Sequence, residues 1–547
     1  MRADHRAHNA RDARGRWLDA ISARIVAFAL VAAFIAGCST LPPGADYPKT
    51  VSTALAQPEL TRLGRQFADA ARAHPGTSAF RMLAVGFDGF LARIQMIDTA
   101  ERTLDLQYFI FRADDTGQLL AEAVLRAADR GVRVRLLLDD GEAKPGDEQM
   151  AALDAHPRVE VRVYNPFSYR GPSRVKRAIE FAFNSARLDY RMHNKLMVVD
   201  NAIALVGGRN VGDEYFQIDP EGQFADDDVF AAGPVVQQLS RTFDEFWNCD
   251  LSIRVRALSP SMTSDAALAR YRAVLEAHRT QVRTDGIDFA ARIATGQPLA
   301  GMLMGKLPLV WASSQLVYDS PDKRRVDKGE MVGRLMHKPT AAAVSAVQSE
   351  LLMITPYLIP GDEGMQIFAD LRKRNATVRV LTSSLEATTV ILAQSGYTRY
   401  RVPLLEMGVN IYEIRSRLGN SRGSGQSARI SRFGTYSLHA KLFVLDRRRL
   451  FVGSMNFDQR SLHLNTEIGL IIDSPELARQ AAARFEAMTS PPNAYEVLLR
   501  PNGNSPQLVW RTEEEGRLVE YDREPARNNG QRLQMKLLSL VDMDAEL

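Results

Sequence analysis

One spaced pattern of polar residues occurs twice in this chain of 547 residues. Each copy reads His-x-Lys, four apolar residues and Asp, followed after six further positions by Gly, then Gly or Ser, any residue and Asn. A pattern with so many fixed positions does not recur by chance, so we predict two related halves that arose by duplication. The defining residues are His193, Lys195, Asp200, Gly208 and Asn210 in the first copy, and His439, Lys441, Asp446, Ser454 and Asn456 in the second.

The segments around the two copies repeat one order of secondary structure. Strands are expected at 103–111, 132–138, 159–164, 351–357, 378–382 and 409–414, and helices at 87–100, 117–130, 340–350, 365–374 and 397–407. Alternating helices and apolar strands are typical of layered α/β domains. We predict two similar α/β/α half-domains with mixed, largely parallel sheets. They would pack with pseudo-twofold symmetry around an active site at their interface.

Composition and the repeat divide the chain into six regions. The predicted regions are a lipoprotein signal peptide at 1–37, a tether at 38–58, a first half at 59–255, a connecting region at 256–333, a second half at 334–500 and a C-terminal tail at 501–547.

The N-terminal region is typical of an exported protein. Basic residues precede the apolar run 25–36, which is shorter than the roughly 20 residues of a membrane-spanning helix and suits a signal peptide. The run ends in Ala36-Gly37-Cys38, which resembles a bacterial lipobox. We therefore expect lipidation of Cys38 and a protein anchored on the periplasmic side of a membrane, with Ser39 favouring the outer over the inner membrane. An uncleaved anchor helix with an incidental cysteine is the alternative.

The residue types of the motif suit chemistry at a phosphodiester. Histidine titrates near neutral pH, so one histidine can attack phosphorus while another protonates the leaving alcohol. Lys195 and Lys441 would neutralise the phosphate oxygens, and Asn210 and Asn456 would donate hydrogen bonds to them. Within each motif, His and Lys share one face of a strand. We also assign the small motif residues, Gly208 and Ser454, to the substrate site.

Each histidine needs a carboxylate on its second ring nitrogen to fix its orientation. We assign Glu467 to His439, because it follows the second motif, and Asp226 to His193, because it follows the first. Asp228 is a competing candidate, and a solvated acidic loop at 226–228 is the alternative. Asp200 and Asp446 belong to the catalytic motif, and we expect them to hold its hairpins in place.

Neither a metal ion nor another cofactor is expected. The sequence contains no His, Cys, Asp or Glu grouping with metal-ligand spacing, and the motif lysines supply the positive charge. The pair Asp139-Asp140 could suggest a magnesium site, but an acidic pair that caps a helix or loop is favoured. The net charge of only +4 and the lack of a basic, aromatic track argue against nucleic acid as a partner.

The paired H-x-K-x4-D motifs resemble those of the phospholipase D superfamily, and the resemblance covers roughly residues 75–500. Short stretches resemble bacterial cardiolipin synthases of the C type: HPGTS (74–78), LDLQY (104–108), AADRGVRVR (127–135), FWN (246–248) and VYDSPDK (317–323). The resemblance implies metal-free transfer of a phosphatidyl group to phosphatidylglycerol, with His193 as nucleophile and His439 as acid. The implied partners are phospholipids (phosphatidylglycerol, phosphatidylethanolamine or cardiolipin) and a membrane reached through the lipid anchor.

The leading hypothesis is therefore a cardiolipin synthase-like phosphatidyltransferase that works through a phosphohistidine. A phospholipase D hydrolase, in which water takes the same intermediate and phosphatidic acid is released, is the alternative. A nuclease and a catalytically silent surface lipoprotein are the less favoured hypotheses.

Overall fold

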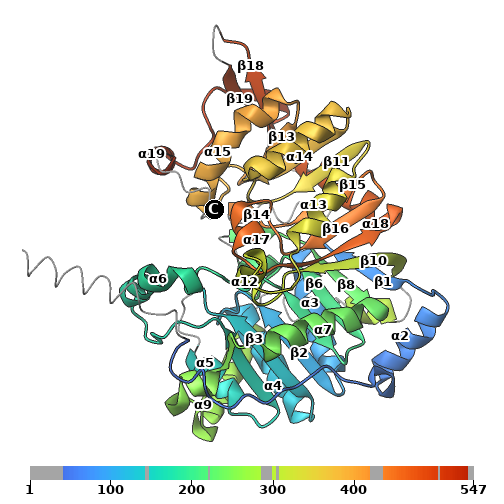
Figure 1. Ribbon diagram of the computed structural model, residues 1–547, viewed down its shortest axis with the longest axis vertical. Coiled ribbons are helices and arrows are strands. Elements are labelled where there is room, and N and C mark those ends of the chain that lie inside the picture. Colours follow the sequence, from blue (N-terminus) through green and yellow to red (C-terminus); the bar gives the residue numbers. More distant parts are fainter. Residues whose placement is uncertain are drawn as a thin grey trace, which may run out of the picture.

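The computed structural model describes residues 41–141, 147–219, 222–284, 298–303, 307–418, 435–502 and 506–539 (Figure 1). The predicted signal peptide and Cys38 lie outside these residues. Among the helices within them, none combines the length and apolar character needed to cross a membrane.

The first half is built on a sheet whose strand order is β1-β8-β6-β5-β2-β3-β4-β9. Its strands are β1 (Ser78–Leu83), β2 (Thr103–Tyr108), β3 (Arg133–Asp139), β4 (Val159–Tyr164), β5 (Leu196–Val199), β6 (Ile203–Gly207), β8 (Asp228–Ala232) and β9 (Ser252–Arg254). Strands β2, β3 and β4 run parallel, and the other pairings are antiparallel.

The second half repeats this order as β10-β17-β16-β15-β11-β12-β13-β18, and β19 and β20 extend its far edge. Its strands are β10 (Val310–Tyr318), β11 (Glu350–Ile354), β12 (Thr377–Ser383), β13 (Asn410–Ile414), β15 (Leu442–Leu445), β16 (Arg449–Gly453), β17 (Ile468–Asp473), β18 (Ala494–Arg500), β19 (Gln507–Glu514) and β20 (Arg517–Tyr521). Again three strands, β11, β12 and β13, run parallel.

The two sheets join where β1 pairs antiparallel with β10. The register places Ser78 opposite Ala312, and these residues occupy equivalent positions in the two halves. A pseudo-twofold axis therefore passes through this pair, as the sequence predicted. A small two-stranded sheet, β7 (Gly222–Ala225) with β14 (Thr435–Leu438), also links the halves.

Helices cover both faces of each sheet (Figure 1). In the first half α3 and α4 lie on one face and α7 on the other, and α13, α14 and α15 oppose α18 in the second. The apolar core between α7 and α18 is continuous across both halves. The helices are α2 (Arg62–Arg72), α3 (Gly86–Thr99), α4 (Asp115–Asp129), α5 (Asp147–Asp154), α6 (Arg174–Leu188), α7 (Pro234–Asn248), α8 (Val255–Leu258), α9 (Asp265–Thr284), α11 (Pro298–Leu303), α12 (Lys323–Asp327), α13 (His337–Ser345), α14 (Gly361–Lys373), α15 (Ile391–Glu406), α17 (Gln459–His463), α18 (Pro475–Thr489) and α19 (Asn529–Leu538).

The fold departs from the sequence prediction in how the strands run. The sheets are mixed, as predicted, but most of their pairings are antiparallel. Each motif forms a hairpin, and its short connection requires antiparallel pairing. Other antiparallel pairings join strands that lie far apart in the sequence.

Two predicted regions also differ from the observed units. The predicted connecting region contains β10, which is the second half's equivalent of β1. The predicted tail contributes β19, β20 and α19, and α19 packs on α15. The second half therefore extends in both directions beyond its predicted bounds.

The described part of the predicted tether is bound to the first half. Lys49 Nζ donates to the carbonyls of Cys249 and Asp250, and the Ser52 and Ala54 N–H groups donate to side chains of α7. The buried Arg135 and Arg162 donate to backbone carbonyls of the same segment. Its backbone groups find partners on the domain, which explains how a Pro- and Gly-rich segment is held without secondary structure of its own.

Candidate active site

Each H-x-K-x4-D motif forms one strand of a tight hairpin. β5 pairs with β6, and β15 pairs with β16, through turns whose two central residues have positive φ: Asp200 (53°) and Asn201 (51°), and Asp446 (54°) and Arg447 (50°). Two successive positive φ angles define the type I′ turn, whose twist matches that of a hairpin. Asp and Asn tolerate this conformation better than most residues, which explains the acidic third position of the motif.

The motif aspartates cap a loop in each half. Asp200 accepts hydrogen bonds of 2.8–2.9 Å from the N–H groups of residues 101, 102 and 103, at the start of β2. Asp446 accepts bonds from the N–H groups of residues 348, 349 and 350, at the start of β11. Asp200 lies roughly 20 Å along the extended chain from His193. These contacts agree with the structural role expected for both residues.

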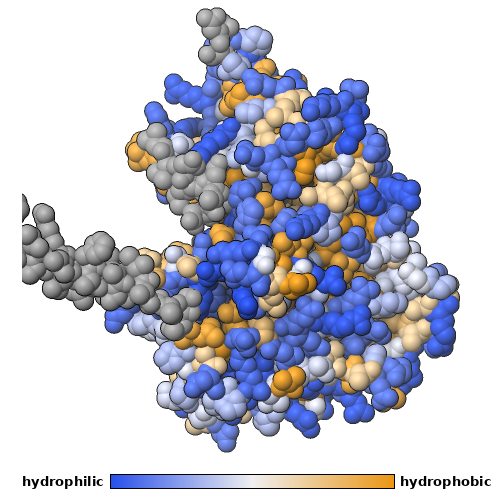
Figure 2. Space-filling model, viewed as in Figure 1, coloured by the Kyte–Doolittle hydropathy of each residue, from blue (hydrophilic) through white to orange (hydrophobic). Residues whose placement is uncertain are grey.

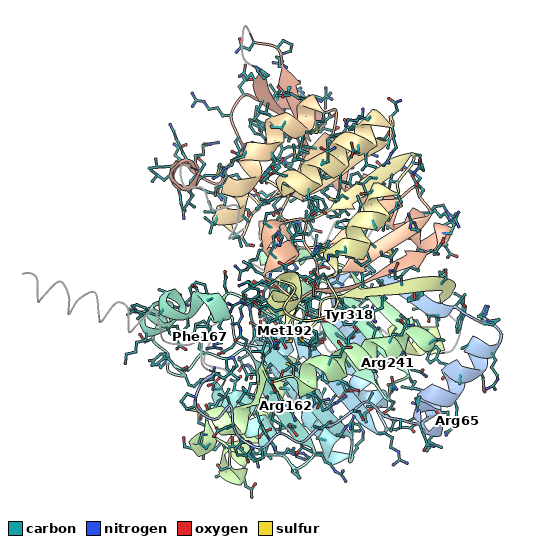
Figure 3. All side chains as sticks on the ribbon, viewed as in Figure 1. Arg65, Arg162, Phe167, Met192, Arg241 and Tyr318 are labelled. Carbon is teal, nitrogen blue, oxygen red and sulfur yellow. The ribbon has the colours of Figure 1, made fainter. Side chains whose placement is uncertain are left out.

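The segment before each histidine pairs with the other half of the molecule. Met192 forms a parallel bridge with Thr466, and Leu438 does the same with Ala225 at the end of the β7–β14 pair. As a result, His193 N–H donates to the Thr466 carbonyl (2.9 Å) and His439 N–H to the Ala225 carbonyl (2.8 Å). Met192 lies at the junction of the two halves in Figure 3.

This crossing overturns the predicted pairing of histidines and carboxylates. Glu467 lies beside His193, with both carboxylate oxygens 2.9 Å from Nδ1, and Asp226 lies 2.5 Å from Nδ1 of His439. The assignment of Glu467 to His439 and of Asp226 to His193 was therefore wrong. Sequence proximity suggested pairing within a half, but the bridges at Thr466 and Ala225 carry each acid to the opposite motif.

Asp228, the competing candidate, has a different role. It accepts hydrogen bonds from the buried guanidinium groups of Arg93 (2.9 Å) and Arg209 (3.2 Å). Arg209 also donates to the Asp226 carbonyl, so this cluster fixes the segment that carries Asp226. The acidic triplet is buried, so the alternative of a solvated loop is wrong.

The buried ion pair of Asp319 and Lys323 fixes the segment that carries Glu467. Asp319 accepts a hydrogen bond of 2.9 Å from the Glu467 N–H, and Lys323 donates to Asp319 and to the carbonyls of Ser461 and Asn465. Both residues belong to the VYDSPDK stretch noted in the sequence. The resemblance of that stretch is the one signal in the sequence that points to these two residues.

His193 and His439 line one cavity of about 610 Å³ between the halves. Phe109 meets the His193 ring edge-on at a centroid distance of 5.1 Å. Phe224 stacks on His439 at 5.3 Å, and Tyr215 meets it edge-on at 5.1 Å. No motif in the sequence points to these aromatic residues, because they contact the histidines only in the folded chain.

The motif lysines lie beside the histidines. Lys195 Nζ donates to the His193 carbonyl (2.6 Å), and Lys441 Nζ lies 2.9 Å from Nδ1 of His439. Burial lowers the pKa of Lys441 to about 8 and that of Lys195 well below its usual value. Burial, with the lysines adding to it, lowers the pKa of His439 to about 3 and that of His193 well below its usual value. Both imidazoles are therefore neutral at pH 7.

The pKa values of the two carboxylates are shifted in opposite directions. Burial raises the pKa of Glu467 to about 7. Burial acts in the same direction on Asp226, but its contact with His439 outweighs that effect and lowers the pKa of Asp226. Asp226 is thus an anion at neutral pH, while Glu467 is poised between its two forms.

The four predicted substrate-binding residues divide into two groups. Asn210 and Asn456 line the cavity. Gly208 and Ser454 lie behind the carboxylates: a Cβ at Gly208 would come within 2.1 Å of Asp226, and the Ser454 hydroxyl donates to Glu467. Contact of Gly208 and Ser454 with substrate stays a prediction. In the structure both residues pack against the carboxylates that orient the histidines.

Asp139 and Asp140 are held by basic groups, in line with the favoured structural interpretation. Asp139 accepts from Arg191 Nε (2.9 Å) and from the Met192 N–H (2.8 Å), just before His193. Asp140 accepts from Arg170 and from the Phe167 N–H. Across the described ranges, no group of three or more His, Cys, Asp or Glu residues is arranged to hold a metal ion.

Comparison with known proteins places the chain in a family. The family described as "Cardiolipin synthase, PLD-like domain" matches residues 93–247 and 341–489, which make up more than half of the chain. Cardiolipin synthase C of Escherichia coli is 33% identical over 488 residues, covering 86% of this chain and 96% of that protein. A cardiolipin synthase of Halalkalibacterium halodurans is 24% identical over 394 residues, covering 72% and 62%.

The crystal structure of phosphatidylserine synthase from Haemophilus influenzae aligns with 79% of this chain and 92% of its own, with a TM-score of 0.49 and 13% identity. The family match covers both copies of the motif, and the Escherichia coli relative is similar along nearly its whole length. The chain therefore belongs to the phospholipase D superfamily, in its cardiolipin synthase-like group.

Proposed function

We propose that this protein is a cardiolipin synthase-like phosphatidyltransferase, which moves the phosphatidyl group of one phospholipid to an alcohol on another through a phosphohistidine. The observation that supports this proposal most is the crossed site, where two histidines from different halves share one cavity and each has a buried carboxylate on Nδ1. A carboxylate on Nδ1 leaves Nε2 of each ring to react.

The first step uses the two histidines differently. Nε2 of His193 attacks the phosphorus atom of the donor lipid, the bond from phosphorus to the leaving alcohol breaks, and His439 gives its proton to the departing oxygen. In the second step His439 takes the proton from the acceptor hydroxyl, whose oxygen attacks phosphorus and breaks the P–N bond. Glu467 supports the positive charge that His193 acquires in between.

Substrate binding supplies the proton that this scheme needs on His439. Its pKa of about 3 reflects burial beside Lys441. A bound phosphodiester brings a negative charge into contact with both side chains, and a nearby opposite charge favours the protonated imidazole. His439 therefore becomes an acid only in the complex, which suits a group that must act after the lipid has entered.

Product analysis with the purified protein tests the proposal. We expect vesicles of phosphatidylglycerol to yield cardiolipin, and we would add phosphatidylethanolamine as a second donor to identify the preferred headgroup. Phosphatidic acid as the sole product would instead support the phospholipase D hydrolase. Cleavage of added DNA would support a nuclease, and the absence of any product would support a silent lipoprotein.

We also propose that the reaction needs no metal ion, since Lys195 and Lys441, which lie beside the two histidines, can supply the positive charge. Turnover is expected to be unchanged after incubation with EDTA. Loss of turnover that added Mg²⁺ or Ca²⁺ restores would contradict this part of the proposal.

Finally, we propose that Cys38 is lipidated and that the enzyme works on the periplasmic side of a membrane, with the outer membrane favoured. The support is the sequence Ala36-Gly37-Cys38 at the end of a short apolar run. Mass spectrometry of the native protein should find Cys38 as the modified N-terminus. A chain that retains residues 1–37 with a free Cys38 thiol would point to an uncleaved anchor.

A further inference from the structure

An amphipathic helix stands at the edge of the cavity. α6 contributes Phe181 and Leu188 to the cavity wall. Its other side carries Val175, Ile179 and Phe183, which are 68%, 53% and 59% exposed. Side chains spaced by four residues lie on the same face of a helix. The helix therefore has an apolar stripe whose side chains are more than half exposed, directly beside a wall of the candidate active site.

The charged residues of α6 also differ between its solvent side and the side that faces the protein. Arg174 and Lys176, which flank the stripe, are exposed cations. The helix's single acidic residue, Glu180, is turned toward the protein, where it accepts hydrogen bonds from the N–H groups of Ser168 and Tyr169. The solvent side of α6 is thus apolar with basic flanks. This is the composition of helices that lie in the interface of an anionic membrane.

The second half presents a similar surface at the same cavity. α19 exposes Leu533 and Leu537 at 61% and 58%, again four residues apart, with Lys536 exposed beside them. α19 packs on α15, and the start of α15 lines the cavity together with Val390, which is 39% exposed. α6 and α19 project from the same side of the molecule (Figure 1), and apolar atoms are visible at α19 in the space-filling view (Figure 2).

We propose that this surface, named here the α6–α19 face and made of Val175, Ile179, Phe183, Val390, Leu533 and Leu537, docks on an anionic phospholipid bilayer. The apolar side chains enter the acyl boundary while Arg174, Lys176 and Lys536 remain at the headgroups. The cavity lies between the two docked helices, so a lipid passes from the bilayer to His193 and His439 without crossing water. This inference rests on the proposed function for the identity of the ligand.

The position of the cavity favours a bilayer over a protein partner. Scattered exposed apolar residues are ordinary, but clusters at the rim of a substrate site mark an interaction surface. A protein that covered α6 and α19 together would also close the cavity between them. A fluid lipid surface can contact both helices and still deliver and remove lipids.

Fluorescence quenching by brominated lipids tests the contact directly in the full-length protein. Phe183→Trp places a reporter in the face, and Val274→Trp on α9, where Val274 is 52% exposed, is the matched control. With vesicles of phosphatidylcholine and phosphatidylglycerol brominated on the acyl chains, we expect quenching at position 183 and none at 274. Anchoring at Cys38 alone cannot insert residue 183, so equal signals at both positions, or none at 183, would overturn the proposal.

Turnover gives a second test that separates docking from chemistry. Ile179→Asp should reduce turnover of phosphatidylglycerol in vesicles about tenfold, because a charge now enters the acyl boundary. It should leave turnover of monomeric short-chain phosphatidylglycerol unchanged, and Val274→Asp should leave both unchanged. Equal turnover of vesicles by Ile179→Asp and by the wild type would contradict docking. If the wild type turns over neither substrate, the proposed function fails while the quenching result still decides whether α6 docks.

Discussion

His193 and His439 occupy equivalent positions in the two halves, but their surroundings differ. Beside His193, Glu467 is held by the hydroxyls of Ser454 and Ser461, and burial raises its pKa to about 7. Beside His439, the pKa of Asp226 is lowered by its contact with the histidine. One histidine therefore has a permanent anion on Nδ1, while the other has a carboxylate that can hold a proton.

Asn210 and Asn456, which occupy equivalent positions in the two motifs, also differ in their hydrogen bonds. Asn210 accepts a hydrogen bond from the Ile110 N–H (3.1 Å) and donates to the Tyr215 hydroxyl (3.0 Å), so its amide is fixed. The side-chain oxygen of Asn456 is buried and has no hydrogen-bond partner among the residues that the structure describes. Duplication thus supplied two copies of the reactive groups, and the residues around them then diverged. The side chain of Asn210 is held by hydrogen bonds within the protein, whereas the side-chain oxygen of Asn456 can still accept one from a ligand.

Loss of either histidine should have the largest effect and should separate the two roles. His193→Ala and His439→Ala are each expected to reduce turnover by about 10⁴-fold or more. If His193 is the nucleophile, a phosphorylated peptide should be recoverable from the wild type and from His439→Ala with an activated donor, but not from His193→Ala. A phosphorylated His439 in place of His193 would reverse the assignment.

Neutralising the carboxylates should test the crossed pairing. Glu467→Gln and Asp226→Asn are each expected to reduce turnover by about 10²- to 10⁴-fold, since the amide no longer favours the productive tautomer. Chemical shifts of the labelled histidines supply the readout: Glu467→Gln should perturb Nδ1 of His193, and Asp226→Asn that of His439. The opposite pattern would restore the pairing within each half.

The pH dependence should distinguish the two carboxylates. Glu467 ionises as the pH rises through about 7, so turnover should increase over that range, and the rise should disappear in Glu467→Gln. The native state binds this proton more tightly than the unfolded chain. The free energy of unfolding should therefore fall between about pH 4.5 and 7 more steeply in the wild type than in Glu467→Gln. Urea titrations of both proteins measure this difference.

Exchanging the small motif residues should give intermediate effects. Gly208→Ala places a Cβ within 2.1 Å of the Asp226 carboxylate, so we expect a loss of about 2 kcal/mol of stability and a clear loss of turnover. Ser454→Ala removes one hydrogen bond to Glu467 and should reduce turnover only about tenfold. A larger loss for Ser454→Ala than for Gly208→Ala would contradict this view of the two sites.

The motif aspartates should affect stability and leave turnover by the folded protein nearly unchanged. Asp200 is fully buried and Asp446 is partly exposed, so Asp200→Ala should cost about 3 kcal/mol and Asp446→Ala about 1 kcal/mol. Urea titration measures the cost, and turnover per folded molecule is the control. Loss of turnover at full folding would assign these residues a part in the chemistry.

The repeated pattern determined much of this protein without a structure. It identified the duplication, the α/β halves, the motif hairpins and the residues His193, Lys195, His439 and Lys441, because alternation along a strand and tight-turn chemistry are local properties. The structural role of Asp200 and Asp446 followed from the same local reasoning. The order of the parallel and antiparallel strands did not, since it depends on which distant strands pair.

The tertiary structure alone decided which carboxylate serves which histidine. Glu467 and Asp226 could be found by their nearness to the motifs, but nearness in sequence indicated the wrong partner for each. The bridges Met192–Thr466 and Leu438–Ala225 exchange the two acids between the halves. The aromatic walls and the opposite pKa shifts of Glu467 and Asp226 depend on the same exchange, because burial and contact are set by residues that only folding brings together.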